Sequence, residues 1–279
     1  MRRRGFSMAE LMVALVIAGL IGVALTRLVI SQTRFIASQD GMMRARAVAR
    51  SGLAVMADEL RQVSWNGVAS ASRDSLSLRI PFAFGVVCGQ SGGSTIVAIM
   101  PPDSARYATA VNAGYAWRDS NGVWAVVEPA TRAHSPNGIC LAAIPQVTAP
   151  EAPSGVAYTL AVTPNVVATP VGGIVYLYTR IVYALAPSGE LPGRVGLWRE
   201  VVGSGNGPEE LVAPFDTSSR FDFLVGPLLV SQTAVPAVLD SIRGVRVKLM
   251  AASEQPPPGR PVPSRFLLTS NLVFRNREF

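Results

Sequence analysis

The first residue with evident chemistry is Glu10, the only charged residue in an apolar run that extends from residue 6 to residue 26. A carboxylate inside a membrane helix costs about 2.5 to 3.5 kcal/mol on insertion scales, so such a residue usually has a partner and a function. The positions three and four residues away, where a partner in the same helix would stand, hold no basic residue. The sequence therefore predicts that Glu10 meets a cation from outside its own helix.

Other residues that could do catalytic chemistry are few. His134 is the only histidine, and its Ser- and Pro-rich surroundings predict an exposed loop. The carboxylates of Glu209, Glu210 and Asp216 show no paired spacing that would mark acid/base work. Residues 89–94 are rich in glycine but lack the following lysine and helix of a phosphate-binding loop. We therefore expect no enzyme, no cofactor and no metal site.

The apolar run that carries Glu10 is long enough to cross a membrane, because a helix rises 1.5 Å per residue and residues 6–26 reach about 30 Å. Arg2, Arg3 and Arg4 precede it, which predicts a cytoplasmic N-terminus and export of everything after Thr26. Two alternatives remain open, namely a cleaved secretory signal and an ordinary uncleaved anchor. Glu10 argues against a secretory signal, which has no use for a carboxylate so early in its hydrophobic region.

A second helical pattern follows the apolar run and predicts one continuous helix from residue 6 to about residue 64. Apolar residues recur there at steps of three and four, while the other faces carry charged residues. The stripe consists of Met42, Ala45, Ala49, Leu53, Met56, Leu60 and Val63. Such an amphipathic helix needs a cover for its apolar face. Gly41 and Gly52 weaken the prediction of an unbroken helix.

Gly5, Phe6 and Glu10, behind a short basic leader and ahead of the apolar run, resemble the prepilin signal of type IV pilins and type II secretion pseudopilins. Met8 and Ala9 stand where the family more commonly has Leu and Ile. Major pilins often have a proline in the first helix, whereas no proline occurs in the first 80 residues of this chain.

The resemblance implies that a membrane peptidase cuts between Gly5 and Phe6 and that the new N-terminal Phe6 is N-methylated with S-adenosylmethionine. It implies that Glu10, the fifth residue of the mature chain, meets the Phe6 amine of a neighbouring subunit, since two buried charges become tolerable together. The alternative for Glu10 is a carboxylate that sits at the headgroup level and merely tolerates its position.

The remainder of the chain has the texture of a β-rich domain. Short β-branched and aromatic runs alternate with Gly, Pro, Ser and Asn, and residues 186–193 predict a hairpin turn. The predicted strands are residues 75–80, 95–100, 158–163, 174–185, 195–201, 221–225, 245–249 and 266–274. The fold class is therefore α+β, with a long N-terminal helix packed on a mostly antiparallel sheet, as in pilins.

The predicted organisation has four parts: a leader (1–5), a transmembrane segment (6–30), an amphipathic continuation of the helix (31–64) and an exported head (65–279). Within the head, residues 81–173 match no family pattern and are interpreted as an insertion. The closing strands, before and after the proline-rich loop 255–261, resemble those of minor pilins of the PilW/PulJ-like group.

Cys88 and Cys140 are the only cysteines, and both lie in the region expected to be exported. Neither has a second cysteine two to four residues away, so a zinc site is not indicated. An even count in an oxidising compartment favours a disulfide that closes a loop within residues 81–173, with two buried free thiols as the alternative.

The net charge is +7, which falls to +4 when the three arginines of the leader are subtracted. The arginines are scattered and lack interleaved aromatic residues, so we interpret them as solvated strand faces and expect no nucleic-acid partner. The predicted function is a structural subunit of a type IV pilus or a type II secretion pseudopilus. Its partners would be other pilins or pseudopilins, the prepilin peptidase and the inner membrane. The alternative is a membrane-tethered exported binding protein or enzyme that does not polymerise.

Overall fold

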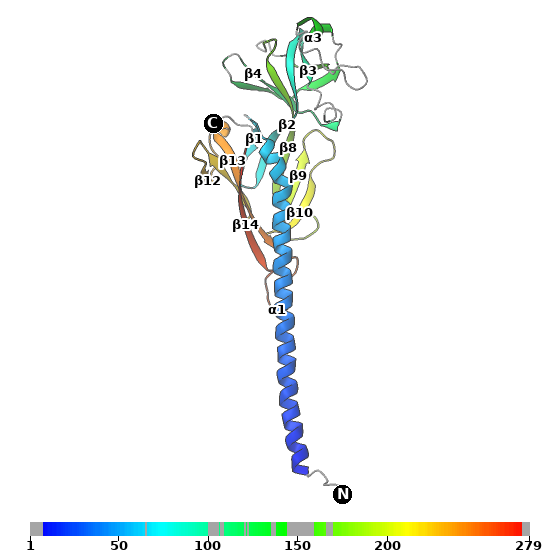
Figure 1. Ribbon diagram of the computed structural model, residues 1–279, viewed down its shortest axis with the longest axis vertical. Helices are drawn as coiled ribbons and strands as arrows, with labels where there is room; N and C mark the ends of the chain where they lie inside the picture. Colours follow the sequence, from blue (N-terminus) through cyan, green and yellow to red (C-terminus); the bar gives the residue numbers. More distant parts are fainter. Residues whose placement is uncertain are drawn as a thin grey trace.

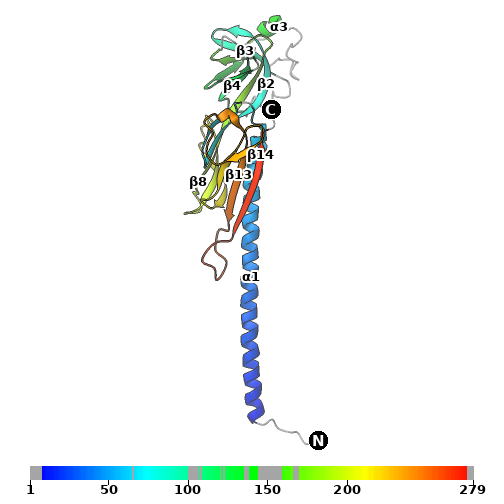
Figure 2. The ribbon, with the colours of Figure 1, turned by 90° about the vertical axis from the view of Figure 1, so that its left-hand side faces the viewer.

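The computed structural model describes residues 8–64, 66–99, 106, 109–119, 121, 123–134, 138–143, 159–165 and 170–274. It consists of one long helix that carries a β-rich head at its C-terminal end (Figure 1). The view at right angles shows the first half of the helix extending below the head as an isolated rod (Figure 2). The α+β class predicted from the sequence is confirmed.

The helix α1 runs without a break over Met8–Gln62 and contains 55 residues. At 1.5 Å per residue, its length is about 80 Å. The predicted continuous helix is confirmed, and Gly41 and Gly52 lie buried where it contacts the head. A glycine lowers helix propensity by only about 1 kcal/mol, which the packing of a long helix outweighs.

The face of α1 that the head covers follows the predicted stripe. The buried residues are Gly41, Ala45, Ala49, Gly52, Met56 and Leu60. They recur at steps of three and four, which keeps one narrow face of a helix toward its partner. Two members of the predicted stripe, Met42 and Leu53, are only half-buried at its margin. Gly41 and Gly52, which the predicted apolar stripe omitted, also lie on this buried face.

The head is built on one antiparallel sheet of 14 strands. The strands are β1 Val68–Ala71, β2 Ser75–Ser91, β3 Ser94–Ile99, β4 Gly114–Arg118, β5 Trp124–Val127, β6 Thr131–His134, β7 Thr159–Thr163, β8 Ile174–Pro187, β9 Val195–Val201, β10 Glu209–Phe215, β11 Arg220–Val225, β12 Val230–Gln232, β13 Ile242–Ala252 and β14 Arg265–Val273. The main path runs β12-β11-β13-β10-β9-β8-β2-β3-β7-β6, with β1, β14, β4 and β5 pairing beside it. The predicted β8–β9 hairpin and the closing β13–β14 pair are both present.

Two lobes share this sheet, because the long strands β2 and β8 run through both of them (Figure 1). The lower lobe packs its core against α1, and the upper lobe has a separate core around Tyr115 and Leu177. The register of β2 on β8 shifts between Pro81 and Ala83. A bulge of this kind bends a strand, so Pro81 marks the point where the lobes meet. The segment interpreted as an insertion therefore continues the sheet of the lower lobe.

Several short elements were absent from the predicted set, and one residue was misplaced. The additional elements are β1, β4, β5, β6, β10, β12, the short helix α3 Gly138–Ala143 and the 3-10 turn η3 Leu239–Ser241. His134 lies at the end of β6 opposite Leu160 of β7, so the prediction of a loop was wrong. All of these strands except β10 have only three to five residues. Such strands are too short to show a clear alternation, and their existence depends on the neighbouring strand.

Candidate assembly helix and its attachment to the head

The first half of α1 exposes a largely apolar surface. Each large apolar side chain from Met8 to Ile36 is between 46% and 82% exposed. By length and composition, this helix is able to cross a membrane. An apolar surface of this extent on a monomer marks contact with a membrane or with other proteins.

Glu10 lies in the first turn of the described helix, on its exposed surface. It lines a shallow depression with four apolar residues, Ala9, Val13, Ala14 and Ile17. The small side chains of the two alanines leave room for another helix to approach the carboxylate. Gly5 and Phe6, the residues of the expected cleavage, lie outside the described residues.

The helix and the head approach closely at two glycines. A Cβ atom placed on Gly41 would lie 3.1 Å from Ser264 Oγ, and one placed on Gly52 would lie 3.0 Å from Phe215 Cζ. Both values are shorter than ordinary van der Waals contact. Glycine at these positions therefore lets the sheet lie directly on the helix backbone.

A part-buried ion pair holds the C-terminal end of α1 on the head. The Glu59 carboxylate accepts hydrogen bonds from Arg199 of β9, with Nη2 2.7 Å from Oε1 and Nε 3.3 Å from Oε2. The Tyr183 hydroxyl of β8 donates to the same carboxylate at 2.6 Å. Burial and the charge of Glu59 raise the pKa of Tyr183, while the hydrogen bond to Glu59 raises the pKa of Arg199. Glu59 of α1 therefore accepts hydrogen bonds from two neighbouring strands, β8 and β9.

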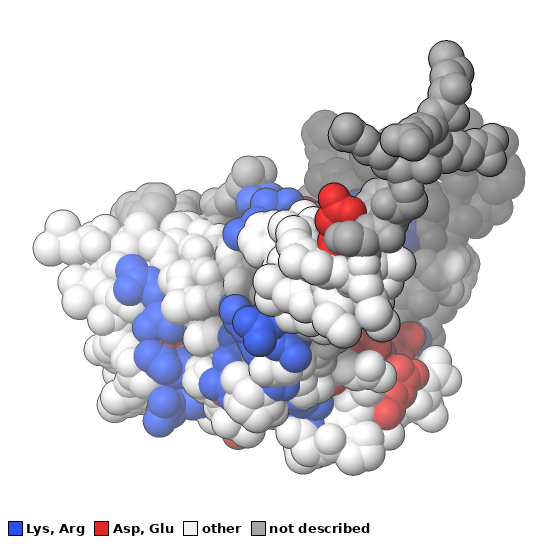
Figure 3. Space-filling view, turned by 90° about the horizontal axis from the view of Figure 1, so that it is seen from below, with Lys and Arg blue, Asp and Glu red and all other residues white. Residues whose placement is uncertain are grey.

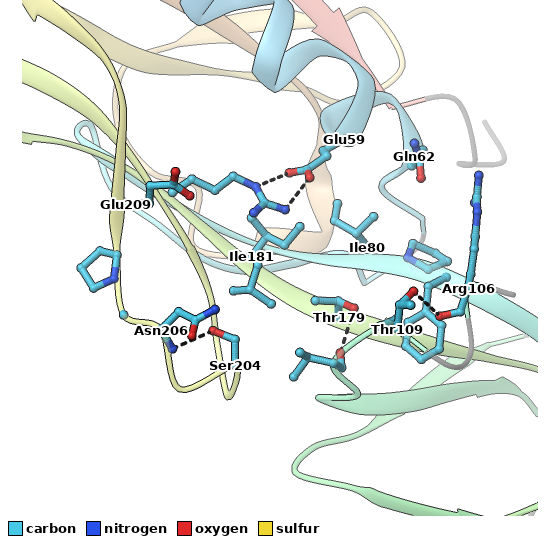
Figure 4. A pocket seen from close by; sticks show the side chains of 18 residues that line it. Glu59, Gln62, Ile80, Arg106, Thr109, Thr179, Ile181, Ser204, Asn206 and Glu209 are labelled. Carbon is cyan, nitrogen blue, oxygen red and sulfur yellow. Dashed lines mark hydrogen bonds and ion pairs between the residues drawn. The ribbon is translucent and has the colours of Figure 1, made fainter.

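An open cleft of about 730 Å³ lies beside this ion pair, between the end of α1 and the strands β8 and β9 (Figure 4). Its floor includes Ile80 and Ile181, and polar groups of Thr179 and Asn206 stand along its wall. Because Arg199 is paired with Glu59 at 2.7 Å, its charge is neutralised within the protein. The interpretation of all arginines as solvated strand faces was therefore wrong for this residue.

A second carboxylate joins the two lobes. Glu128, which follows β5 in the upper lobe, forms ion pairs with Arg79 of β2 at 3.0 Å and with Arg180 of β8 at 2.9 Å. The Tyr178 hydroxyl lies 3.3 Å from its Oε2. Burial raises the pKa of the Glu128 carboxyl, but the hydrogen bonds and charges of the two arginines outweigh this effect and hold it below its usual value. These arginines are also structural and half-buried, which again corrects the solvated interpretation.

A third carboxylate, Asp222 of β11, is buried within the lower lobe. It pairs with Lys248 Nζ at 2.6 Å and with Arg220 Nε at 3.0 Å. Burial raises the pKa of Asp222, but the hydrogen bonds and charges of Lys248 and Arg220 have the larger, opposite effect. The pKa of Asp222 therefore lies below its usual value. The ion pair of Asp222 with Lys248 joins β11 to β13 and so stabilises the sheet that covers α1.

These carboxylates predict that the head loses stability in acid. The pKa of Glu128 lies below its ordinary value of 4.5 and that of Asp222 below 3.8, so the folded protein binds fewer protons than the unfolded chain. Their contribution is complete above about pH 5 and is lost as the pH falls through the lowered values. We expect the melting temperature to fall by about 4 to 8 °C, or about 2 kcal/mol, between pH 5 and pH 3.

Thermal unfolding of the head followed by circular dichroism at several pH values measures this effect. The Glu128→Gln variant should be less stable at pH 7 and less sensitive to acid. Asp58→Asn is the matched control, because the Asp58 side chain is 85% exposed. Stability that is unchanged or higher at pH 3 would contradict the assignment.

The two cysteines lie together in the upper lobe. Cys88 of β2 and Cys140 of α3 form a disulfide with their Cα atoms 4.8 Å apart, across a sequence separation of 52 residues. It fastens α3 to the edge of a small buried cluster that includes Ile96 and Ala98. Among the described residues, no three His, Cys, Asp or Glu side chains are grouped so that they could hold a metal ion.

Comparison with known families gives one match, at the N-terminus. Residues 1–26 match the family model described as the prokaryotic N-terminal methylation motif. The match includes the expected cleavage position and the beginning of α1 with Glu10. This motif and the apolar helix are consistent with a single-pass protein of the inner membrane, processed by a prepilin peptidase and assembled with other pilins. No curated protein and no solved structure matches the chain.

Sequence reasoning found the N-terminal motif but missed the residues that attach the helix to the head and those that join the two lobes. Glu59 and Arg199 are 140 residues apart, and Glu128 and Arg180 are 52 residues apart. Nothing in the local pattern distinguishes these residues from solvated ones. A sparse set of carboxylates among many arginines was the only available signal, since each buried carboxylate needs a cation.

Proposed function

We propose that the chain is a minor pilin or pseudopilin, a structural subunit that assembles through α1 into a type IV pilus or a type II secretion pseudopilus. The observation that carries the proposal is the combination of the methylation motif with a helix whose beginning, residues 8–26, exposes apolar side chains around Glu10. Because α1 continues into the core of the head, a contact made by its first half positions the whole subunit.

The order of elements supports the minor-pilin assignment. A single N-terminal helix is followed by an antiparallel head that ends in the β13–β14 pair and its proline-rich loop. This order supports the proposed relation to the PilW/PulJ-like group. In this proposal the N-terminus faces the cytoplasm before processing, and the head lies outside the inner membrane.

The proposed assembly contact joins Glu10 of one subunit to the Phe6 amine of its neighbour. Cleavage between Gly5 and Phe6 would create this amine at the membrane boundary. The depression between Ala9 and Ala14 supports the contact, because it allows a second helix to come close to the carboxylate. A buried pair of opposite charges then selects one axial register of two apolar helices.

Mass spectrometry of the mature N-terminus tests the proposal. We expect a chain that begins at Phe6 and carries one N-methyl group, which adds about 14 Da to the unmodified mass. A strain that lacks the prepilin peptidase serves as the control and should yield the chain from Met1. An intact Met1 in the wild-type strain, or a start at Leu25, would overturn the proposal.

A further inference from the structure

The part of the head nearest the N-terminus is the β13–β14 loop, residues 253–264. In both ribbon views this loop hangs below the strands and beside α1 (Figures 1 and 2). Its prolines line a groove with Asp40, Gly41 and Arg44 of the helix. A Cβ atom placed on Gly259 would lie 3.2 Å from Arg34 Nε. The loop therefore reaches down to the level of Arg34.

This level lies close to the point where the helix would leave a bilayer. The apolar run ends at Thr26, and Arg27 follows directly. Arg34 is seven residues further on, which places it about 10 Å above Arg27. A bilayer has a polar layer of several ångströms outside its hydrocarbon core, so both arginines fall within reach of lipid headgroups.

Three arginines are exposed at this base of the head, namely Arg27 and Arg34 of α1 and Arg260 of the loop. None of them takes part in an ion pair with another described residue. Asp40, the nearest acidic residue on the helix, is already paired with Arg44 at 2.9 Å. Glu254 of the loop is exposed. Viewed from the N-terminal end, Lys and Arg side chains lie around the end-on helix, and most acidic side chains gather to one side (Figure 3).

The composition of the loop suits an interface between water and lipid. Five of the residues between 255 and 264 are prolines, which have no N–H group to satisfy when the backbone leaves water. Val262 is 56% exposed, and Pro258 and Pro261 are exposed beside it. An apolar rim next to three guanidinium groups matches an anionic phospholipid surface, whose phosphates accept hydrogen bonds from arginine.

We propose that this base, formed by Arg27, Arg34, Arg260 and residues 255–262, docks on the anionic phospholipid headgroups of the membrane that α1 crosses. Anionic phospholipid is the proposed partner because the base lies next to the membrane-spanning segment of α1 and carries positive charge. Before assembly, the head would rest on the bilayer in a fixed position instead of swinging about its helix. The inference rests on α1 crossing a bilayer and is independent of fibre assembly.

Full-length protein reconstituted into vesicles tests the inference. Val262→Cys provides an attachment site for an environment-sensitive fluorophore, because the two native cysteines are bonded to each other. We compare vesicles of phosphatidylcholine alone with vesicles that also contain phosphatidylglycerol. The expected result is a blue-shifted emission, several-fold brighter, in the anionic vesicles. Equal emission in the two kinds of vesicle would overturn the inference.

Charge variants identify the residues responsible. In the labelled protein, Arg34→Gln combined with Arg260→Gln should remove the difference between the vesicles. Arg246→Gln is the matched control, because Arg246 lies on β13 about 20 Å farther from the base. An equal loss in the control would overturn the assignment, and so would a blue shift caused by inorganic phosphate with neutral vesicles. Mass spectrometry of Phe6 is unaffected by either outcome, so the fibre proposal is tested separately.

Discussion

A Glu10→Ala subunit is expected to insert into the membrane and fold normally but to be missing from assembled fibres. The carboxylate lies on the exposed first turns of α1, far from the head, so its loss removes no contact of the core. In the fibre, the alanine would leave the neighbouring Phe6 amine buried without a counter-charge, which costs about 3 to 5 kcal/mol. Incorporation should therefore fall at least about tenfold, since 1.4 kcal/mol already corresponds to a factor of ten.

Immunoblots of sheared fibres and of the membrane fraction measure the incorporation. Glu10→Gln separates charge from shape, because it keeps the size of the side chain, and it should fail as the alanine variant does. Asp58→Ala removes an exposed carboxylate from the other half of the same helix and should assemble normally. Normal assembly of the Glu10 variants would refute the role proposed for the carboxylate.

Gly52→Leu is expected to lower the stability of the subunit by about 3 kcal/mol. Even a Cβ atom at this position would lie 3.0 Å from Phe215 Cζ and 3.3 Å from Leu249 Cδ1. Phe215 and Leu249 are both fully buried, so a larger side chain must push the sheet off the helix. The melting temperature of the detergent-solubilised protein should fall by about 6 to 12 °C.

Gly19→Leu is the matched control for this prediction. It makes the same substitution in the same helix, but nothing lies within 4 Å of the added Cβ atom. The control should leave the melting temperature of the head unchanged. Leucine favours the helix more than glycine does, so helix propensity cannot account for a loss of stability in either variant. Equal destabilisation by both variants would contradict the role given to the contact with the sheet.

The helix and its two halves were predictable because they depend on patterns within a short stretch of chain. The apolar run and the stripe from Ala45 to Leu60 repeat at helical spacing, and this periodicity determines which face is buried wherever the head happens to lie. The N-terminal motif was predictable for the same reason, since Gly5, Phe6 and Glu10 stand within six residues. The long strands β8, β13 and β14 were found from their alternation and their turns.

The short strands and the position of His134 were beyond the reach of local patterns. β6 has four residues and exists because β7 offers it a hydrogen-bonding partner from Thr131 to His134. An isolated segment of this length has no stable strand structure of its own. The local sequence around His134 therefore predicted a loop.

What the sequence determined by itself is the N-terminal segment, namely a methylation motif on a helix with one apolar half and one amphipathic half. Only the tertiary structure decided how that helix is attached to the head. The contact of Gly52 with Phe215 and the ion pair of Glu59 with Arg199 join residues more than 100 positions apart. Contacts between residues so distant in the chain depend on the order and register of the strands, which no local periodicity encodes.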